Sequence, residues 1–155
     1  MKNSFLILFI ASLSTISCQK NSGDDNNEET KTQLLIKSSW KFDNAGIDQN
    51  KDGTAELPVP ASTFSACLLD NTITFASNGI GTVSENTVVC PGAAPVTPIT
   101  WSLSNNATTL NLSGGGIAGV SGSLKVLELS DTKLSLSKDT VLLGTSLAFI
   151  INLKH

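Results

Sequence analysis

The stretch that decides the fold is Leu147-Ala-Phe-Ile-Ile-Asn-Leu-Lys154, near the C-terminus. Its apolar residues recur at every second position, and an extended chain places such residues on one face. The residues of this face are Leu147, Phe149, Ile151 and Leu153, while Asn152 and Lys154 fall on the other face. The stretch therefore predicts a β-strand with one buried side and one side in solvent.

The same alternation recurs N-terminal to this stretch, for example at residues 72–75, 109–112 and 134–137. Turn-forming pairs such as Asn78-Gly79 and Asn105-Asn106 separate the apolar segments, as in hairpins. No segment shows a convincing helical period, so we expect an all-β chain. We place strands at residues 37–44, 71–76, 80–89, 98–104, 108–113, 122–129, 133–138 and 145–154.

The short connections favour an antiparallel, up-and-down order of the strands. Eight strands in this order can close into a barrel, which removes exposed sheet edges and leaves room for a packed interior or one small ligand. A β-sandwich has a similar number and spacing of strands, so it is the second choice.

Composition excludes several classes of function. The 155 residues carry a net charge of −3, and all ten basic residues are lysine, so no guanidinium group is available to clamp phosphate or base edges. Nucleic acid is therefore not an expected partner. The chain has no tyrosine, and its single histidine is the last residue, His155. We expect a non-enzymatic protein, because acid–base chemistry usually depends on such side chains.

Residues 1–17 have the layout of an export signal, with Lys2 before an apolar run and small residues at the end. The following string, Thr15-Ile16-Ser17-Cys18, resembles the lipobox of bacterial lipoproteins, in which a cysteine receives a diacylglyceryl group. The resemblance implies lipidation of Cys18 and a lipid-anchored protein at the outer membrane. Leucine is usual where Thr15 stands, so cleavage of an ordinary secretory signal nearby is the alternative.

Residues 18–33 are polar and acidic, which predicts a disordered tether between the lipidated cysteine and a domain over 34–155. Asp24-Asp25 and Glu28-Glu29 resemble the acidic stretch of some lipoproteins exposed on the cell surface. An ordinary solvated linker would have the same composition, so the direction in which the domain faces stays open.

Over roughly residues 36–153, a succession of short motifs carries a resemblance to a known family. The motifs are Leu35-Ile-Lys-Ser-Ser-Trp40-Lys41, Asp48-Gln-Asn-Lys-Asp-Gly53, Cys67-Leu-Leu-Asp70-Asn-Thr-Ile-Thr-Phe75, Asn78-Gly79, Cys90 and Thr100-Trp101-Ser-Leu103. Together they resemble the lipocalin-like domain of bacterial outer-membrane lipoproteins. This resemblance implies a small antiparallel barrel with Trp40 closing its base. Ser38 replaces the glycine of the lipocalin pattern, and the tyrosine and arginine of its other signatures are absent.

Cys67 and Cys90 remain as a pair once Cys18 is lipidated. Exported proteins meet oxidising conditions, so we predict a disulfide between them. Two buried free thiols are the alternative. A catalytic redox pair is not expected, because the two cysteines lack C-x-x-C spacing.

The segment Asp48-Gln-Asn-Lys-Asp-Gly-Thr-Ala-Glu56 matches the first half of a calcium-binding loop. Its candidate ligands are Asp48, Asn50, Asp52, Thr54 and Glu56. The bidentate glutamate that ends such loops is missing, because Val59 stands in its place, and Glu56 or Asp70 would have to complete the shell. Asp, Asn and Gly also form plain turns through side-chain hydrogen bonds to the backbone, so a calcium site and a simple turn are both open.

Gly114-Gly-Gly-Ile-Ala-Gly119 formally matches the phosphate-binding pattern G-x-G-x-x-G. It lies between expected strands, with no helix whose N-terminus could hold a phosphate, so we interpret it as a flexible hairpin loop.

Two classes of function remain, and both are binding functions. The first is a surface interaction module with a packed interior, whose contacts come from loops at 54–66, 91–97 and 114–121. The second is a carrier of a small apolar ligand, which needs a cavity of about 300 Å³ or more. We favour the interaction module, because no inward-pointing polar residue in the sequence is evidently placed to orient a ligand. The expected partners are the membrane, through the lipid anchor, and either a surface protein or a small apolar ligand.

Overall fold

The computed structural model describes residues 25–155. The predicted export signal, the predicted lipidation site Cys18 and residues 19–24 of the expected tether lie outside this range. The elements, in chain order, are α1 (Asp25–Ile36), β1 (Trp40–Asp48), β2 (Leu57–Val59), η1 (Ala61–Thr63), α2 (Ala66–Leu69), β3 (Thr72–Phe75), β4 (Ile80–Ser84), β5 (Val96–Ser104), β6 (Thr109–Ile117), β7 (Val120–Leu129), β8 (Lys133–Leu142) and β9 (Thr145–Lys154).

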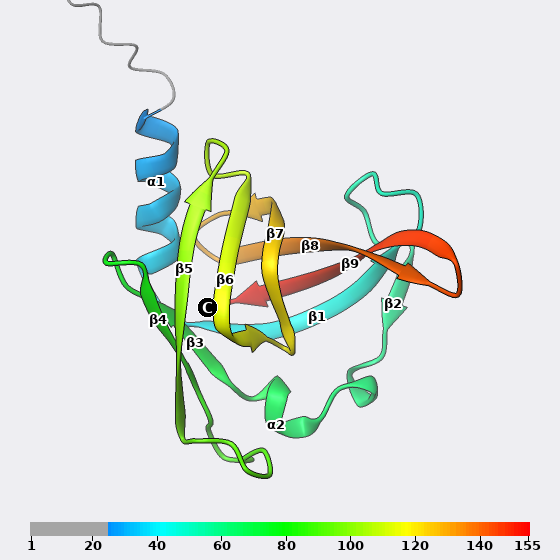
Figure 1. Ribbon diagram of the computed structural model, residues 1–155, viewed down its shortest axis with the longest axis horizontal. Helices are drawn as coiled ribbons and strands as arrows, with labels where there is room; N and C mark the ends of the chain where they lie inside the picture. The colour runs from blue at the N-terminus through cyan, green and yellow to red at the C-terminus, as the bar shows by residue number, and fades with distance from the viewer. Residues whose placement is uncertain (1–24) are drawn as a thin grey trace, which may run out of the picture.

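Strands β1 and β3–β9 form a closed antiparallel barrel (Figure 1). From β3 to β9, each strand pairs with the next one in the chain, and pairing of β1 with both β3 and β9 closes the barrel. The predicted eight-stranded up-and-down barrel is therefore confirmed. The sandwich alternative is wrong, because the β1–β9 pairing makes one continuous sheet. Strand β2, absent from the sequence-based expectation, pairs with β1 beyond the point where β3 ends.

The alternation seen in the sequence sets the inner face of the barrel. Across β8 and β9, Leu134 lies opposite Leu153 and Leu136 opposite Ile151, and all four side chains are buried. Burial of a Leu or Ile side chain stabilises the fold by roughly 1.5–3 kcal/mol. These residues belong to one core, whose other members include Trp40, Ile73, Phe75, Val83, Ile99, Trp101, Leu110, Leu112, Ile117, Leu124 and Leu129.

Helix α1 corrects the expectation of a disordered tether over its residues. Its apolar residues lie only in the last turn, so it shows no helical period from end to end. Glu28 and Glu29 near its N-terminus favour a helix, because their negative charges interact favourably with the positive end of the helix dipole. Tertiary contacts hold its other end, where Leu35 is completely buried and Lys31 donates a hydrogen bond to the carbonyl of Leu129. No helix in the described range is both long and apolar enough to cross a bilayer.

The helix packs at the end of the barrel where β1 begins, which we call the base. Trp40 is fully buried there, and its indole Nε1 donates a hydrogen bond to the carbonyl oxygen of Leu35. The ring of His155 contacts Trp40 in a tilted arrangement, with 3.8 Å between the ring centroids and 35° between the ring planes. In Figure 1, α1 and the β8–β9 hairpin lie at opposite sides of the molecule. We call the end that carries this hairpin the mouth.

The glycine-rich segment is not the flexible loop that the sequence suggested. Strand β6 continues through Gly114–Gly116 to Ile117, and only Ala118 and Gly119 form the turn before β7. Gly114 has φ +94°, and an added Cβ would lie 2.8 Å from the carbonyl oxygen of Pro98. Glycine is thus required here by close backbone approach, because a side chain would collide with β5. The other two expected contact loops are also partly strand, since 57–59 forms β2 and 96–97 begins β5.

Candidate functional site

A pocket of about 330 Å³ opens at the mouth of the barrel. Four consecutive strands, β7, β8, β9 and β1, supply its walls. The lining residues are Ile47, Val120, Lys138, Asp139, Thr140, Leu142, Leu147 and Phe149. Most of this surface is apolar, and the charged groups are Lys138 and Asp139 alone. Such a lining suits a small apolar molecule better than a sugar or a nucleotide.

Strand register shows that this pocket is part of the barrel interior. Phe149 lies opposite Ile47 on one side and Lys138 on the other, so these three residues point to the same face of the sheet. The next residues on that face toward the base are Ala45, Leu136 and Ile151, all of which are buried. The pocket lies on the mouth side of this buried layer, where buried Leu147 forms part of its lining.

Phe149, which lines the pocket, belongs to a cluster of three aromatic rings. Phe64, from the segment between η1 and α2, contacts Phe149 at 6.2 Å and Phe42 at 5.2 Å between ring centroids. This brings a residue of the long connection after β1 against the inner face of β9. Aromatic contacts at these distances are favourable, so they hold Phe149 in place at the pocket.

The β8–β9 hairpin continues the apolar surface outward from the pocket. At its tip Leu142 is 56% exposed and Leu143 is 98% exposed. Leu142 also lines the pocket, so the hairpin and the pocket form one continuous apolar surface. Leu143 has φ +51° and Gly144 has φ +81°, which are left-handed conformations typical of a tight hairpin turn.

A second hollow, of about 340 Å³, lies on the outer face of β5, β6 and β7. Its hydroxyl and amide groups are already bonded to one another. Ser123 donates to the Asn111 side chain at 2.7 Å, and Thr100 donates to Ser113 at 3.2 Å. We therefore regard the mouth pocket, rather than this polar groove, as the binding site.

The acidic loop after β1 brings the carboxylates of Asp48, Asp52 and Glu56 together, with one oxygen of each within 4.8 Å of the others. Buried Asp48 accepts backbone hydrogen bonds from Lys51 and Gly53, at 2.5 and 2.8 Å. These bonds are those of a plain turn, and they occupy carboxylate oxygens that a calcium ion would also use.

Asp52 and Glu56 lie on the exposed side of the same loop. Asp52 accepts from the backbone N–H of Thr54 and from the Asn50 side chain, and these bonds hold the pKa of Asp52 below its usual value of 3.8. Glu56 accepts from the backbone N–H of Gln49. Asp70 does not join the loop, because its carboxylate accepts from the backbone of Val88.

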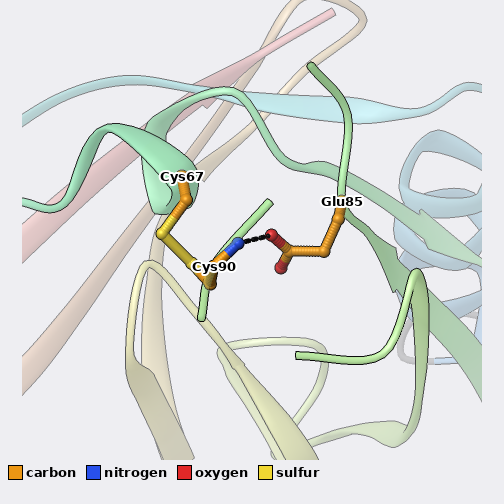
Figure 2. Close-up of side chains that lie close together, drawn as sticks. All are labelled: Cys67, Glu85 and Cys90. Carbon is orange, nitrogen blue, oxygen red and sulfur yellow. Dashed lines mark hydrogen bonds between the residues drawn. A yellow bond between two sulfur atoms is a disulfide. The ribbon is translucent and has the colours of Figure 1, made fainter. Parts of the chain in front are cut away.

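The predicted disulfide between Cys67 and Cys90 is confirmed (Figure 2). It ties helix α2 to the connection between β4 and β5. Beside it, the Glu85 carboxylate accepts from the backbone N–H of Cys90 at 2.8 Å and from the Asn71 side chain at 3.0 Å. Both sulfur atoms take part in the disulfide bond, so we interpret this group as a structural disulfide rather than a metal site or a redox centre.

The geometry of the barrel agrees with sequence comparison. The family model described as "Lipocalin-like domain" matches residues 15–136, which is more than half of the chain. The chain belongs to the lipocalin-like domain family. No curated protein matches the sequence. Membership in this lipocalin-like family, together with the closed barrel, suggests binding of small apolar molecules.

Reasoning from the sequence placed Leu147 and Phe149 on the buried face of a strand but did not identify the pocket that they line. Lys138 stands two positions after Leu136 in a strand of alternating residues, so the same alternation could have placed it on the inner face. The strand was expected to end at residue 138, so Lys138 was not assigned to its inner face. In the structure β8 continues to Leu142. Of the residues singled out from the sequence, the acidic loop and the disulfide lie outside the pocket, and Cys18 lies outside the described residues.

Proposed function

We propose that this lipocalin-like protein binds a small apolar ligand in the pocket at the mouth of its barrel. The observation that carries the proposal is the pocket of about 330 Å³, lined mostly by apolar residues of β7, β8, β9 and β1. Its volume lies at the lower end of the roughly 300–1,000 Å³ of known ligand pockets. The ligand is therefore small, about the size of one short acyl chain or one ring system.

This proposal reverses the preference for an interaction module that the sequence suggested. That preference assumed a completely packed interior, whereas a pocket of about 330 Å³ opens on the mouth side of Leu136 and Ile151. It also assumed three flexible contact loops, parts of which are strands. Binding without catalysis is in keeping with the position of His155, which contacts Trp40 at the base rather than facing the pocket.

A neutral fluorescent probe, N-phenylnaphthylamine, tests the proposal without involving charge. We expect the probe to bind with a stoichiometry of one and to become more fluorescent. In Val120→Trp the added ring fills the pocket, so binding weakens by about tenfold or more. Ser102→Trp is the matched control, because it adds the same ring to the polar outer groove and should leave binding unchanged. Equal binding by both variants, with melting temperatures intact, would overturn the proposal.

We further propose that the domain is anchored by lipid at Cys18 and resides at the outer membrane. The support is the export-type sequence of residues 1–17 and the lipobox-like string that ends at Cys18. Cys18→Ala should abolish labelling by a radioactive fatty acid and release the domain into the soluble fraction. Label retained by this variant would contradict lipidation. Protease treatment of intact cells would then show whether the domain faces outward.

Calcium binding at the acidic loop is the third part of the proposal. The convergence of three carboxylates supports it, because oxygen ligands held close together are what calcium requires. The bidentate glutamate is lacking, so the expected affinity is weak, of the class found in extracellular modules. The ion would stabilise the loop and has no part in the mouth pocket.

A further inference from the structure

Strand β8 is paired on both sides along only part of its length. Residues 134–137 lie between β7 and β9, whereas residues 138–142 pair with β9 alone within the described range. Figure 1 shows the β8–β9 hairpin projecting away from β7, so the other side of β8 is open there. Residues 138–142 therefore form a free sheet edge at the mouth of the barrel.

The hairpin turn determines which backbone groups face this edge. Leu143 and Gly144 both have positive φ, as in a type I′ turn of two residues. In such a turn the flanking residues, here Leu142 and Thr145, are joined by backbone hydrogen bonds. Hydrogen-bonded and non-hydrogen-bonded pairs alternate along an antiparallel ladder, so the N–H and C=O of Val141 point away from β9. These two groups can pair with a further strand.

The end of β8 lacks the features that usually protect a sheet edge, namely proline, a bulge or charged side chains. The edge strand β2 is three residues long and contains Pro58. The free part of β8 has no proline, and its last residues are apolar, with Val141 68% exposed and Leu142 56% exposed. Its charged residues stand at its beginning, where Asp139 pairs with Lys51. The apolar end is therefore suited to pairing with another chain.

The charge around this edge favours a basic partner. The ion pair between Lys51 and Asp139, at 3.1 Å, joins the acidic loop to β8. Carboxylates outnumber ammonium groups here: the former belong to Asp48, Asp52, Glu56 and Asp139, and the latter to Lys51, Lys125 and Lys138. This charge repels a second copy of the chain or an anionic membrane, and it attracts a basic segment.

We infer that the free edge of β8 binds an extended, basic segment of another protein, which joins the sheet as an additional strand. Backbone hydrogen bonds to Val141 then contribute affinity, and alternate side chains of the segment contribute specificity. Apolar side chains on one face of the segment would lie beside Thr140 and Leu142, and basic side chains on its other face beside Asp139. The inference goes beyond the proposed function, because it concerns a backbone edge rather than the ligand in the pocket.

Fluorescence polarisation with a labelled heptapeptide, Lys-Val-Lys-Val-Lys-Val-Lys, tests the inference. A chelator keeps the acidic loop free of divalent cations during the titration. We expect the wild-type protein to bind one peptide saturably, and Val141→Pro to weaken binding by about tenfold or more, because proline has no N–H to donate. Ser146→Pro is the matched control. Ser146 lies opposite Val141, so this variant places proline on the other edge of the same hairpin and should leave the affinity unchanged.

The charge of the partner is tested separately. The peptide Glu-Val-Glu-Val-Glu-Val-Glu keeps the backbone and the valines, and we expect it to bind about tenfold more weakly than the lysine peptide. Asp139→Asn should weaken binding of the lysine peptide by about threefold, and added salt should do the same. Asp131→Asn, at the base, is the control and should have no effect.

The other occupants of the edge are outcomes of the same series of experiments. The inference is overturned if the wild type does not bind the lysine peptide, or if Val141→Pro binds it as tightly as the wild type does. A dimer in sedimentation that Val141→Pro dissociates would assign the edge to a second copy instead. Binding to phosphatidylglycerol vesicles without binding of the peptide would assign the apolar tip to a membrane. None of these results affects the proposed function, which N-phenylnaphthylamine tests independently.

Discussion

The indole Nε1 of Trp40 donates a hydrogen bond to the carbonyl oxygen of Leu35 over 2.9 Å, and both residues are completely buried. This bond joins the last turn of α1 to the first residue of β1. The helix is thereby part of the folded domain, and it covers the end of the barrel opposite the pocket.

Leu35→Ala should therefore destabilise the whole domain rather than the helix alone. We expect the free energy of unfolding to fall by about 3 kcal/mol, the usual cost of removing a buried leucine side chain. Leu34→Ala is the matched control, because Leu34 is only partly buried, and we expect a loss of about 1 kcal/mol or less. Urea unfolding followed by tryptophan fluorescence measures both. Equal effects of the two substitutions would mean that α1 does not dock through Leu35.

The disulfide between Cys67 and Cys90 closes a loop with a sequence separation of 23 residues. Replacing both cysteines by serine should lower the free energy of unfolding by about 3 kcal/mol, because the unfolded chain gains conformational freedom. The same chemical denaturation experiment measures this loss. Mass measurement after alkylation without reductant should find neither cysteine alkylated, and alkylation at both positions would contradict the pairing.

Leu143 sits at the tip of the β8–β9 hairpin in a left-handed conformation, with φ +51°. Asparagine tolerates this conformation better than leucine, so Leu143→Asn should raise the free energy of unfolding by about 1 kcal/mol. The reverse change provides the control. Asn106 has φ +55° in another turn, and Asn106→Leu should destabilise by a similar amount. If the free energy of unfolding of Leu143→Asn is lower than that of the wild type, the Leu143 side chain contributes packing energy at the tip.

Calcium should raise the melting temperature if the acidic loop binds it. We expect a chelator to lower the melting temperature of the wild type and to have no effect on Asp52→Asn. Asp131→Asn is the control, because Asp131 pairs with Lys37 at the base, away from the loop. Identical melting of the wild-type protein with calcium and with chelator would leave the loop as a turn stabilised by side-chain hydrogen bonds.

Low pH should reduce the stability that the same loop contributes to the fold. Hydrogen bonds from the Thr54 backbone and the Asn50 side chain hold the pKa of Asp52 below its ordinary value of 3.8 in the folded protein. A carboxyl group with a depressed pKa stabilises the fold above its ordinary pKa and loses that contribution as the pH falls through the lower, folded value. Unfolding measured between pH 5 and about 2.5 should therefore depend less on pH in Asp52→Asn than in the wild type.

The barrel could be predicted from the sequence because its strands are half-buried, so each one shows apolar residues at alternate positions. The run at Leu147–Leu153 shows this most clearly, and its strand bounds of 145–154 agree with β9. Helix α1 could not be predicted in this way, since its formation depends on the burial of Leu35 against residues that are distant in the sequence. Strand β2 is three residues long and includes Pro58, and such a segment carries too few residues to show a period.

The binding site could be predicted only in part. The disulfide follows from the number of cysteines and the expected compartment, which are properties of the sequence itself. The pocket depends on how side chains from β1, β7, β8 and β9 come together. The segment Gly114–Gly116 was wrongly predicted to be a loop, because glycine is typical of loops. In the structure these glycines allow close approach of β6 to its neighbours.

The most direct test of the binding pocket is a methyl NMR titration of the wild-type domain with decanol. Isoleucine, leucine and valine methyl groups report on all parts of the barrel at once. We expect saturable shifts at Ile47, Val120, Leu142 and Leu147, with Leu110 and Leu134 in the packed core nearly unchanged. Shifts confined to exposed residues away from the mouth, such as Val88 and Val89, or no saturable shift at all, would contradict a ligand site inside the barrel.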